Sequence, residues 1–446
     1  MSSSAASLRS GLTIALGRAA RLAARLRGGG SGGTALPGLV MEKTDPGFLR
    51  RTLDQLPLGV VVVSGTNGKT TTTKMVVELL TAQGLKVLTN RTGSNFVRGV
   101  LASLLTEVDA VGRLDADVAV LELDEAHAVR FVRRVRPRAA LLLNVMRDQL
   151  DRFGEIDYTA SLLHSIAKAT SDVVVLNGDD PRLAAPAFLE GVSARVVSFG
   201  TGEDLRSLFL SDDDLRTGQT GPRAHQDESQ IPGPRVTLEA IDGQRATVRV
   251  DGASHEVDFA IPGVHNLLNA CAALGVVLEV LGEDADLPGL LATLGTVQAA
   301  FGRGEVLTLD GRPVQLSLVK NPAGFRMGLL SAAAQAQSGE VVVVAINDEY
   351  ADGRDMSWLW DVDFAALRPG GVAVVTGVRA WDMALRLRYD DVEVTDVEPD
   401  LRKAVALMRR VAADTDRPMR IFTTYTAMLA LRSILGEMTD VEEVMS

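Results

Sequence analysis

The chain contains 446 residues, 46% of them hydrophobic, and carries a formal net charge of −11. This length allows roughly two or three domains, each with its own apolar core, and the acidic balance argues against nucleic acid as a general partner. The one cysteine, Cys271, excludes an intramolecular disulfide and a cysteine zinc site, so we expect no zinc and a reducing, cytoplasmic location. Cys271 lies in an apolar helical pattern, which favours a packed thiol over a nucleophile.

Residues 8–33, LRSGLTIALGRAARLAARLRGGGSGG, are amphipathic, rich in arginine and free of acidic residues. This composition has three possible interpretations. It is typical of a transit peptide. It also suits a helix packed on the following domain, or a helix lying on the anionic inner face of a membrane. We favour packing, with peripheral membrane contact as the second interpretation.

The segment VVVVSGTNGKTTTTKMV, residues 60–76, predicts a buried strand, a glycine loop and a helix. The free amides at the start of the helix suit phosphate oxygens, Lys69 supplies a positive charge, and the Thr70 hydroxyl is a natural Mg²⁺ ligand. We expect both side chains to be exposed to ligand rather than to the core. The spacing G-x-x-G-K-T is shorter than the usual phosphate-binding motif, and a chance glycine turn is the alternative. The predicted nucleotide-binding residues of the loop are Gly65, Thr66, Asn67, Gly68, Lys69, Thr70 and Thr71.

Strand and helix patterns alternate from Val60 to Asn177, which predicts a doubly wound, mostly parallel α/β sheet with ligands at the carboxyl ends of its strands. From about 200 to 235 the sequence is polar and rich in Gly and Pro, and we interpret it as a flexible insert. Residues 235–259 alternate around two Asp-Gly pairs and predict a small unit of β-hairpins.

A second α/β pattern begins near Gly302. We therefore predict three parts: a lead-in over 1–57 with an amphipathic helix, an ATP-binding domain over 58–302, and a Rossmann-like α/β domain over 303–446 that binds a partner.

Polar side chains follow three consecutive strands of the first pattern. Glu122, Asp124 and Glu125 follow one strand, and residues 144–155 and 176–181 follow the next two. Because these strand ends meet at one edge of the sheet, a second metal ligand is expected there. An exposed acidic turn is the alternative for the first group, and ordinary loops for the other two.

These motifs occur in the order found in Mur ligases and folylpolyglutamate synthetases. The segments concerned are GTNGKTTT, VLELDE, NVMRDQLDRFGE, LNGDDP, IPGVHNLLNACAA and FGRGE. Two further segments, LVKNPAGF and INDEYADGRDMSWLWDVDF, resemble the MurT family, the Mur-ligase-like subunits of lipid II isoglutaminyl synthases. The resemblance covers residues 25–446 apart from the insert.

The resemblance implies a Mur-ligase-type central ATPase domain and specific residue roles. Lys69 and Thr70 would serve the triphosphate and its Mg²⁺, and Glu122 would be the acidic metal ligand. The nucleotide contacts it implies are His265 and Asn266, with Asn269 supporting them, and Arg303 at the domain hinge.

The chain also departs from the Mur ligase pattern. Gln149 stands where Mur ligases have histidine, so metal ligation there is weaker or indirect. The segment that aligns with their carbamylated lysine contains no lysine, and Lys168, a turn further on, receives no role. We expect no separate UDP-binding domain, since only residues 1–59 precede Val60. The insert occupies the place of a four-cysteine zinc ribbon found in many family members.

Residues 347–361 place aspartates among two tryptophans. The indoles could simply pack a domain interface. The resemblance instead implies that an aspartate orients the catalytic histidine of a GatD-like glutamine amidotransferase partner. We prefer Asp352 for this role, with Asp355 next.

The resemblance as a whole implies ATP-dependent amidation of the D-glutamate α-carboxylate of lipid II, through an acyl phosphate and with ammonia from the partner. A stand-alone acid–amino acid ligase and a non-catalytic nucleotide-binding scaffold are the alternatives.

Overall fold

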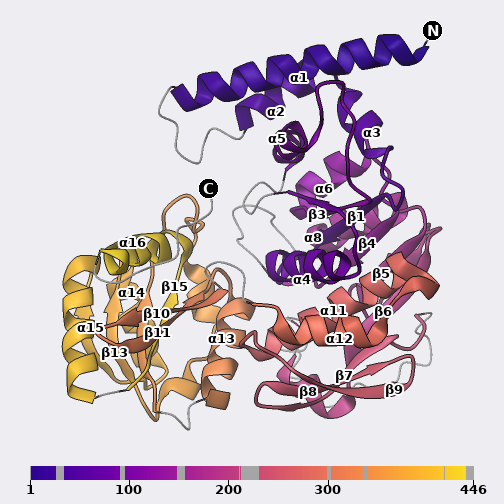
Figure 1. Cartoon of the computed structure of the whole chain (residues 1–446). Helices are drawn as coiled ribbons and strands as arrows, with labels where there is room; N and C mark the ends of the chain where they lie inside the picture. The colour runs from indigo at the N-terminus through magenta and orange to yellow at the C-terminus, as the bar shows by residue number, and fades with distance from the viewer. Residues whose placement is uncertain are drawn as a thin grey trace.

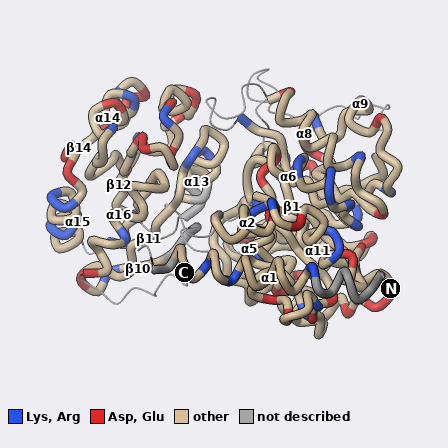
Figure 2. The backbone as a smooth tube through the Cα atoms, turned by 90° about the horizontal axis from the view of Figure 1, so that it is seen from above, with Lys and Arg blue, Asp and Glu red and all other residues tan. Residues whose placement is uncertain are grey.

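A computed structural model describes residues 2–26, 35–90, 96–147, 156–209, 211, 231–298, 303–335, 339–415 and 417–437. Two α/β units lie side by side, each built on its own sheet (Figures 1 and 2). The predicted boundary near Gly302 lies outside the described residues and stays a prediction.

The first sheet has nine strands in the order β2-β3-β1-β4-β5-β6-β7-β8-β9. The strands are β1 (Val60–Ser64), β2 (Val87–Thr89), β3 (Val118–Glu122), β4 (Ala139–Leu142), β5 (Val173–Asn177), β6 (Arg195–Thr201), β7 (Val236–Asp242), β8 (Arg245–Val250) and β9 (Ala253–Asp258). Pairing is parallel from β2 to β7, and β7, β8 and β9 are antiparallel, as the two Asp-Gly pairs predict. β1 lies between β3 and β4, so the strands that follow it are added first on one side of β1 and then on the other. The loop after β1 therefore lies at a topological switch point, where ligands bind in sheets of this type.

Helices cover both faces of this sheet (Figure 1). They are α1 (Ser2–Leu26), α2 (Ala35–Thr44), α3 (Phe48–Leu53), α4 (Lys69–Ala82), α5 (Val97–Glu107), α6 (Glu125–Val132), α8 (Ile156–Ala169), α9 (Pro186–Leu189), α11 (Val264–Leu281) and α12 (Leu287–Thr296). Val61 and Val63 face one apolar cluster, with α4, α11 and α12, while Val60 and Val62 face the other. The sheet is therefore buried on both sides, which explains the unbroken run of valines.

Three sequence expectations can be compared with this fold. The interpretation of α1 as a packed helix is confirmed, since Ile14 is 1% exposed and lies in the core shared with α5. Regular structure extends past the predicted start of the insert at 200, because β6 ends at Thr201 and residues 203–208 form a 3-10 helix, η2. Residues 210 and 212–230 lie outside the described part of the chain.

Cys271 is fully buried on α11, as predicted for a packed thiol, and burial raises its pKa to about 12. The stretch Val264–Asp284, which contains α11, is the one described helix long and apolar enough to cross a membrane. Its most apolar window is 78% buried within the protein, so it is a core helix of the sheet.

The second sheet has six strands in the order β10-β11-β15-β12-β13-β14, parallel except for β10 with β11. Its elements are β10 (Arg303–Leu309), β11 (Arg312–Leu318), α13 (Pro322–Gln335), β12 (Val341–Ala345), η5 (Ser357–Asp361), η6 (Ala365–Leu367), β13 (Val372–Thr376), α14 (Ala380–Tyr389), β14 (Val394–Glu398), α15 (Leu401–Thr415), β15 (Met419–Thr423) and α16 (Tyr425–Gly436). The loop after β12 holds the predicted aspartates, and it too lies at a switch point, between β13 and β15.

Candidate functional site

The glycine loop after β1 requires glycine at two positions. Gly68 adopts a φ of 87° immediately before α4, and a Cβ there would lie 2.6 Å from the Asn269 side-chain oxygen. Gly65 has a φ of 135°, and its Cβ would lie 3.0 Å from the Asn144 amide nitrogen. Both glycines therefore combine a backbone conformation that other residues rarely adopt with a close neighbour. The loop is held in a shape that leaves the α4 N-terminus open to an anion.

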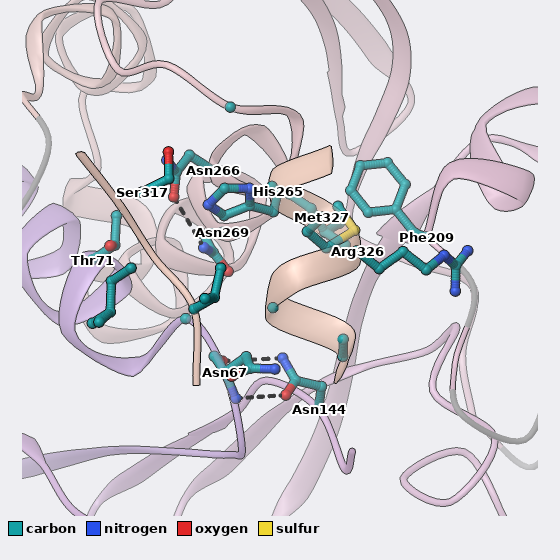
Figure 3. A pocket seen from close by; sticks show the side chains of 18 of the residues that line it. Asn67, Thr71, Asn144, Phe209, His265, Asn266, Asn269, Ser317, Arg326 and Met327 are labelled. Atoms are coloured by element: carbon teal, nitrogen blue, oxygen red, sulfur yellow. Dashed lines mark hydrogen bonds between the residues drawn. The ribbon is translucent and has the colours of Figure 1, made fainter. Parts of the chain in front are cut away.

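Asn144, the second residue after β4, fixes this loop through both its backbone and its side chain. The Thr66 amide donates to the Asn144 carbonyl at 3.1 Å, and the Asn67 amide donates to the Asn144 side-chain oxygen at 2.9 Å. The Asn144 side-chain nitrogen in turn donates to the Asn67 carbonyl at 3.1 Å (Figure 3). The sequence signal for Asn144 was its place at a strand end, but nothing in the pattern distinguished it from its neighbours.

Lys69 is not open to ligand, contrary to the sequence expectation. The residue is only 8% exposed, and its ammonium donates to the carbonyls of Gly65 and Thr66. It also forms an ion pair with Glu125, 3.3 Å from the ammonium nitrogen to Oε1. The loop carbonyls and this carboxylate satisfy the charge of Lys69, which explains why the side chain folds back on its own loop.

Thr70 and Glu122 meet as the sequence predicted for a metal site. The Thr70 hydroxyl donates to Glu122 Oε1 at 2.9 Å. Asn90 fixes the Glu122 backbone by donating to its carbonyl at 2.8 Å and accepting from its amide at 2.9 Å. A separation of 2.9 Å matches the edge of an octahedron with ligand bonds of about 2.1 Å, the geometry that Mg²⁺ demands.

The two oxygens therefore fit Mg²⁺ that is completed by phosphate and water. No group of three or more His, Cys, Asp or Glu residues that could hold a metal ion is found in the described ranges.

The first residues of α11 bring three predicted side chains to the same place. His265, Asn266 and Asn269 all line a pocket beside the glycine loop (Figure 3). Asn266 is 2% exposed and donates to the Pro262 carbonyl at 2.6 Å, so its orientation is fixed. Asn269 lies beside Gly68 and donates to the Asn266 side-chain oxygen at 3.4 Å, and its predicted supporting role stays a prediction.

The second domain closes this pocket through two residues to which the sequence analysis gave no role. Asn321, fully buried, exchanges hydrogen bonds of 3.1 and 3.3 Å with Asn67. The Lys320 ammonium donates to the Thr66 carbonyl at 3.3 Å. These residues belong to the segment LVKNPAGF, which was singled out as a family marker without a role for its lysine or asparagine.

The pocket thus combines residues of both domains. From the first domain it takes Asn67, Gly68, Thr71, Asn144, Asn177, His265, Asn266 and Asn269, among others, and from the second Ser317, Lys320, Arg326, Met327 and Arg420, among others. Lys69, Thr70 and Glu122 lie on the neighbouring side of the loop and do not line it. The side chain of Arg303 and all of Gln149 lie outside the described part of the chain, so their predicted roles stay predictions.

The acids after β5 have structural partners. Asp179 accepts from the Thr201 amide at 2.6 Å, and Asp180 accepts from the Val145 amide at 2.6 Å. Asp180 also accepts from the backbone amides of the turn that follows it. These carboxylates hold strand ends and the Asn144 segment in place, so they position the site rather than face a ligand.

Asp352 is the most buried aspartate of the loop after β12, at 2% exposure. Its carboxylate accepts from the Thr426 amide at 2.7 Å, from the Thr426 hydroxyl and from the Glu349 amide at 3.0 Å. Thr426 lies in the first turn of α16, so Asp352 binds the positive end of that helix. Its predicted role toward a partner's histidine stays a prediction.

Asp355 is more accessible. It accepts from the Ser357 amide at 2.9 Å, and hydrogen bonds from Ser357 hold the pKa of Asp355 below its ordinary value. The two remaining aspartates form ion pairs: Asp348 with Arg379 at 2.8 Å, and Asp361 with Arg147 of the first domain at 2.7 Å. The loop therefore also contacts the ATP-binding domain.

The two tryptophans of this loop differ in their surroundings. Trp358 is 2% exposed and packs against Phe325 in the core of the second domain, not between the two domains. Trp360 is 49% exposed and lies beside Tyr389, with ring centroids 5.5 Å apart. Trp358 is therefore a core residue of the second domain, and the ring beside Trp360 also belongs to that domain, so neither ring contact supports packing between domains.

Two family models match the chain. The Mur ligase middle domain matches residues 63–277, and the MurT ligase C-terminal model matches residues 318–428. The MurT subunit of lipid II isoglutaminyl synthase (glutamine-hydrolyzing) from Staphylococcus aureus (strain COL) is 31% identical, over 90% of this chain and 92% of the relative. The corresponding subunit from Streptococcus pneumoniae is 29% identical, over 93% of this chain and 95% of the relative.

Solved structures share the fold. MurF from Acinetobacter baumannii superposes with a TM-score of 0.66 at 20% identity, covering 89% of this chain and 80% of that one. MurF from Thermotoga maritima in complex with ADP gives 0.65 at 18% identity, covering 90% and 84%. At these identities the likeness establishes the Mur ligase fold alone.

Proposed function

Because the chain belongs to the MurT family of Mur ligases, we propose that it is the synthase subunit of a glutamine-hydrolysing lipid II isoglutaminyl synthase. The proposed reaction amidates the D-glutamate α-carboxylate of the lipid II stem peptide at the cytoplasmic face of the membrane. The observation that carries the proposal is a triphosphate loop and a MurT-type second domain that share one pocket.

The chemistry requires two transfers. A carboxylate oxygen attacks the γ-phosphorus of ATP and ADP leaves, which gives an acyl phosphate. Ammonia then attacks the acyl carbon, phosphate leaves, and the nitrogen loses a proton to give the carboxamide of D-isoglutamine. Bound Mg²⁺ supplies charge stabilisation to the transferring phosphoryl group, so the residues around it act by position and electrostatics.

Lys69 must change partners for this reaction. Its ammonium now contacts Gly65, Thr66 and Glu125. Phosphate oxygens at the α4 N-terminus would replace these partners, because a phosphate carries more charge than a backbone carbonyl. Glu125 would then be the carboxylate that holds Lys69 while the nucleotide is absent.

The second domain completes the site. Lys320 lies 3.3 Å from the Thr66 carbonyl, close enough to the loop to contact a bound phosphate. The Asn67–Asn321 pair holds the two domains together at the same point. We assign Lys320 to nucleotide binding and the Asn67–Asn321 pair to closure of the pocket.

The nitrogen source is proposed to be a GatD-like glutamine amidotransferase. The relatives are named as subunits of a glutamine-hydrolysing enzyme, which implies a complex. Asp352 and Asp355 are both candidates to orient the partner's histidine. A partner's side chain could reach the partly exposed carboxylate of Asp355 in this conformation. Asp352 would first have to break its hydrogen bonds with Thr426.

An aromatic surface on the second domain supports this partner. It is formed by Trp360, Trp381, Leu385 and Tyr389, which are 49%, 66%, 59% and 75% exposed. The last three lie four residues apart on one side of α14. Exposed aromatic side chains of this kind are typical of protein interfaces. The surface adjoins the aspartate loop, because Arg379, just before α14, forms an ion pair with Asp348.

The test compares nitrogen sources. The chain should co-purify with the class I glutaminase of its host, and glutamine should support amidation only in that complex. A stand-alone ligase would instead couple an amino acid without any partner, and a scaffold would bind ATP without consuming it. Either result would replace the proposed function.

A further inference from the structure

Helix α1 has two different faces. Its inward face contains the buried residues Ser10, Thr13, Ile14 and Gly17. A Cβ on Gly17 would lie 2.9 Å from Met41 and 3.1 Å from Leu105, so the helix is packed closely on α2 and α5. The inward face makes these packing contacts, and the opposite side of the helix takes no part in them.

The outward face of α1 is apolar as well. Leu12, Leu16 and Leu22 are 63%, 39% and 60% exposed. Ala15, Ala19 and Ala23 are exposed between them. These six residues recur every three or four positions, so they form a continuous stripe, which we call the outer face of α1. A stripe that faces water at this spacing marks a contact with another apolar surface.

The charge of α1 is opposite to that of the whole chain. Residues Ser2–Leu26 include four arginines and no acidic residue, whereas the chain carries −11. Arg9 keeps 57% of its side chain exposed while it contacts Asp45, and Arg18 is exposed while it donates to the Val108 carbonyl at 3.1 Å. The outer face is therefore flanked by guanidinium groups that stay at the surface.

The position of α1 suits a flat partner. The helix lies lengthwise along the outside of the first domain, above α2 and α5 (Figure 1). At 1.5 Å per residue, a helix of 25 residues is about 37 Å long. Its outer face, from Leu12 to Ala23, can therefore meet a planar surface without displacing any other element of the described part of the chain.

We propose that the outer face of α1 docks the enzyme on an anionic lipid surface. An amphipathic helix with arginines beside its apolar stripe lies in the interface plane, with leucines among the acyl chains and guanidinium groups at the phosphates. A second copy of this chain is a poorer occupant, because a two-fold contact would bring the arginines of both helices together. The inference goes beyond the proposed function, since it needs neither ATP nor a partner.

The experiment is co-sedimentation of the full chain with vesicles, without nucleotide. Vesicles of phosphatidylglycerol and phosphatidylcholine in equal parts should bind it, and pure phosphatidylcholine vesicles should bind it far less. Binding should weaken at high salt, because the Debye length falls to about 3 Å at 1 M.

The variant Leu12→Gln/Leu22→Gln should reduce binding roughly tenfold for each leucine. Its fold should be unaffected, because both side chains are exposed. The matched control is Val306→Gln/Leu429→Gln, which changes two exposed apolar residues of the second domain, 59% and 39% exposed, and should bind as the unchanged chain does.

Two outcomes would overturn the proposal. One is absence of binding to the anionic vesicles, or equal binding by the Leu12→Gln/Leu22→Gln variant. The other is a dimer, detected by sedimentation velocity without vesicles, that the same variant dissociates; the outer face would then be an interface between copies. Normal ATP turnover by the Leu12→Gln/Leu22→Gln variant would show that lipid binding and the proposed function are separate properties.

Discussion

The Thr70 hydroxyl donates to the Glu122 carboxylate at 2.9 Å, although 51 residues separate them in the chain. Register explains the contact: β1 pairs with β3 so that Val63 lies opposite Glu122. Glu122 is the last residue of β3, and this register places its carboxylate next to the start of the glycine loop. Strand pairing and the shape of the glycine loop together bring two oxygens that suit one Mg²⁺ next to each other.

Glu122→Gln should raise the Mg²⁺ concentration needed for half-maximal ATP turnover by about 10- to 100-fold. The amide keeps the shape and the hydrogen bond to Thr70 but loses the negative charge that binds the cation. A magnesium titration of activity measures this effect. Glu125→Gln serves as the control, and a larger loss of metal dependence there than in Glu122→Gln would move the metal ligand to residue 125.

Lys69→Ala should lower ATP turnover by about 10²- to 10³-fold, because the transferring phosphoryl group loses a cation. Thermal unfolding should also occur at a lower temperature, because Glu125 is only 3% exposed and loses the cation with which it pairs. Turnover at the rate of the unchanged chain would exclude Lys69 from the site.

Asn67→Ala and Asn321→Ala should each weaken nucleotide binding, and their effects should not add. The two amides bond to each other, so a double-mutant cycle should give a coupling of about 0.5–3 kcal/mol. Isothermal titration with ADP provides the measurement. Additive effects would mean that the two domains do not meet through this pair when nucleotide is bound.

Cys271 should resist alkylation in the folded protein. Burial raises its pKa from 9.0 to about 12, whereas the unfolded thiol ionises near pH 9. The unfolded chain thus binds fewer protons between pH 9 and 12, so this thiol lowers the free energy of unfolding as pH rises through that window. Iodoacetamide labelling at pH 8 should follow unfolding, and rapid labelling of the native protein would contradict the burial of Cys271.

Asp352→Asn and Asp355→Asn separate structural support from partner chemistry. If one of them orients the partner's histidine, its variant should lose glutamine-driven amidation by up to about 10⁴-fold. Ammonium chloride should restore its product. Because Asp352 binds the N-terminus of α16, its variant should also unfold at a lower temperature. Equal impairment with glutamine and ammonium in both variants would exclude the triad role.

Much of the fold could be predicted from local patterns. The strand of four valines, the glycine loop and the two Asp-Gly hairpins each follow from short-range chemistry, and Figure 1 shows the strands concerned, β1 and β7 to β9. β6, β10 and β14 were not predicted. β14 is only partly buried, and β6 begins with an exposed and a partly buried residue, which weakens the apolar pattern of both strands.

The site was predictable where it depends on neighbouring strand ends of one sheet. Thr70 and Glu122 could be paired because strand ends share one edge of the sheet. The role of Asn321 could not, because its contact with Asn67 spans 254 positions and two domains. The retracted position of Lys69 depends on Glu125, a residue that the sequence offered only as a second metal ligand.

The most direct test of the central claim is amidation by the purified chain with ammonium as the nitrogen source. The chain is incubated with lipid II, ATP, Mg²⁺ and ammonium chloride, and the product is examined by mass spectrometry. We predict that one hydroxyl of the stem peptide is replaced by an amino group, at the D-glutamate α-carboxyl, with one ADP formed for each amide. ADP formation without any amide, or addition of a whole amino acid to the peptide, would contradict the account.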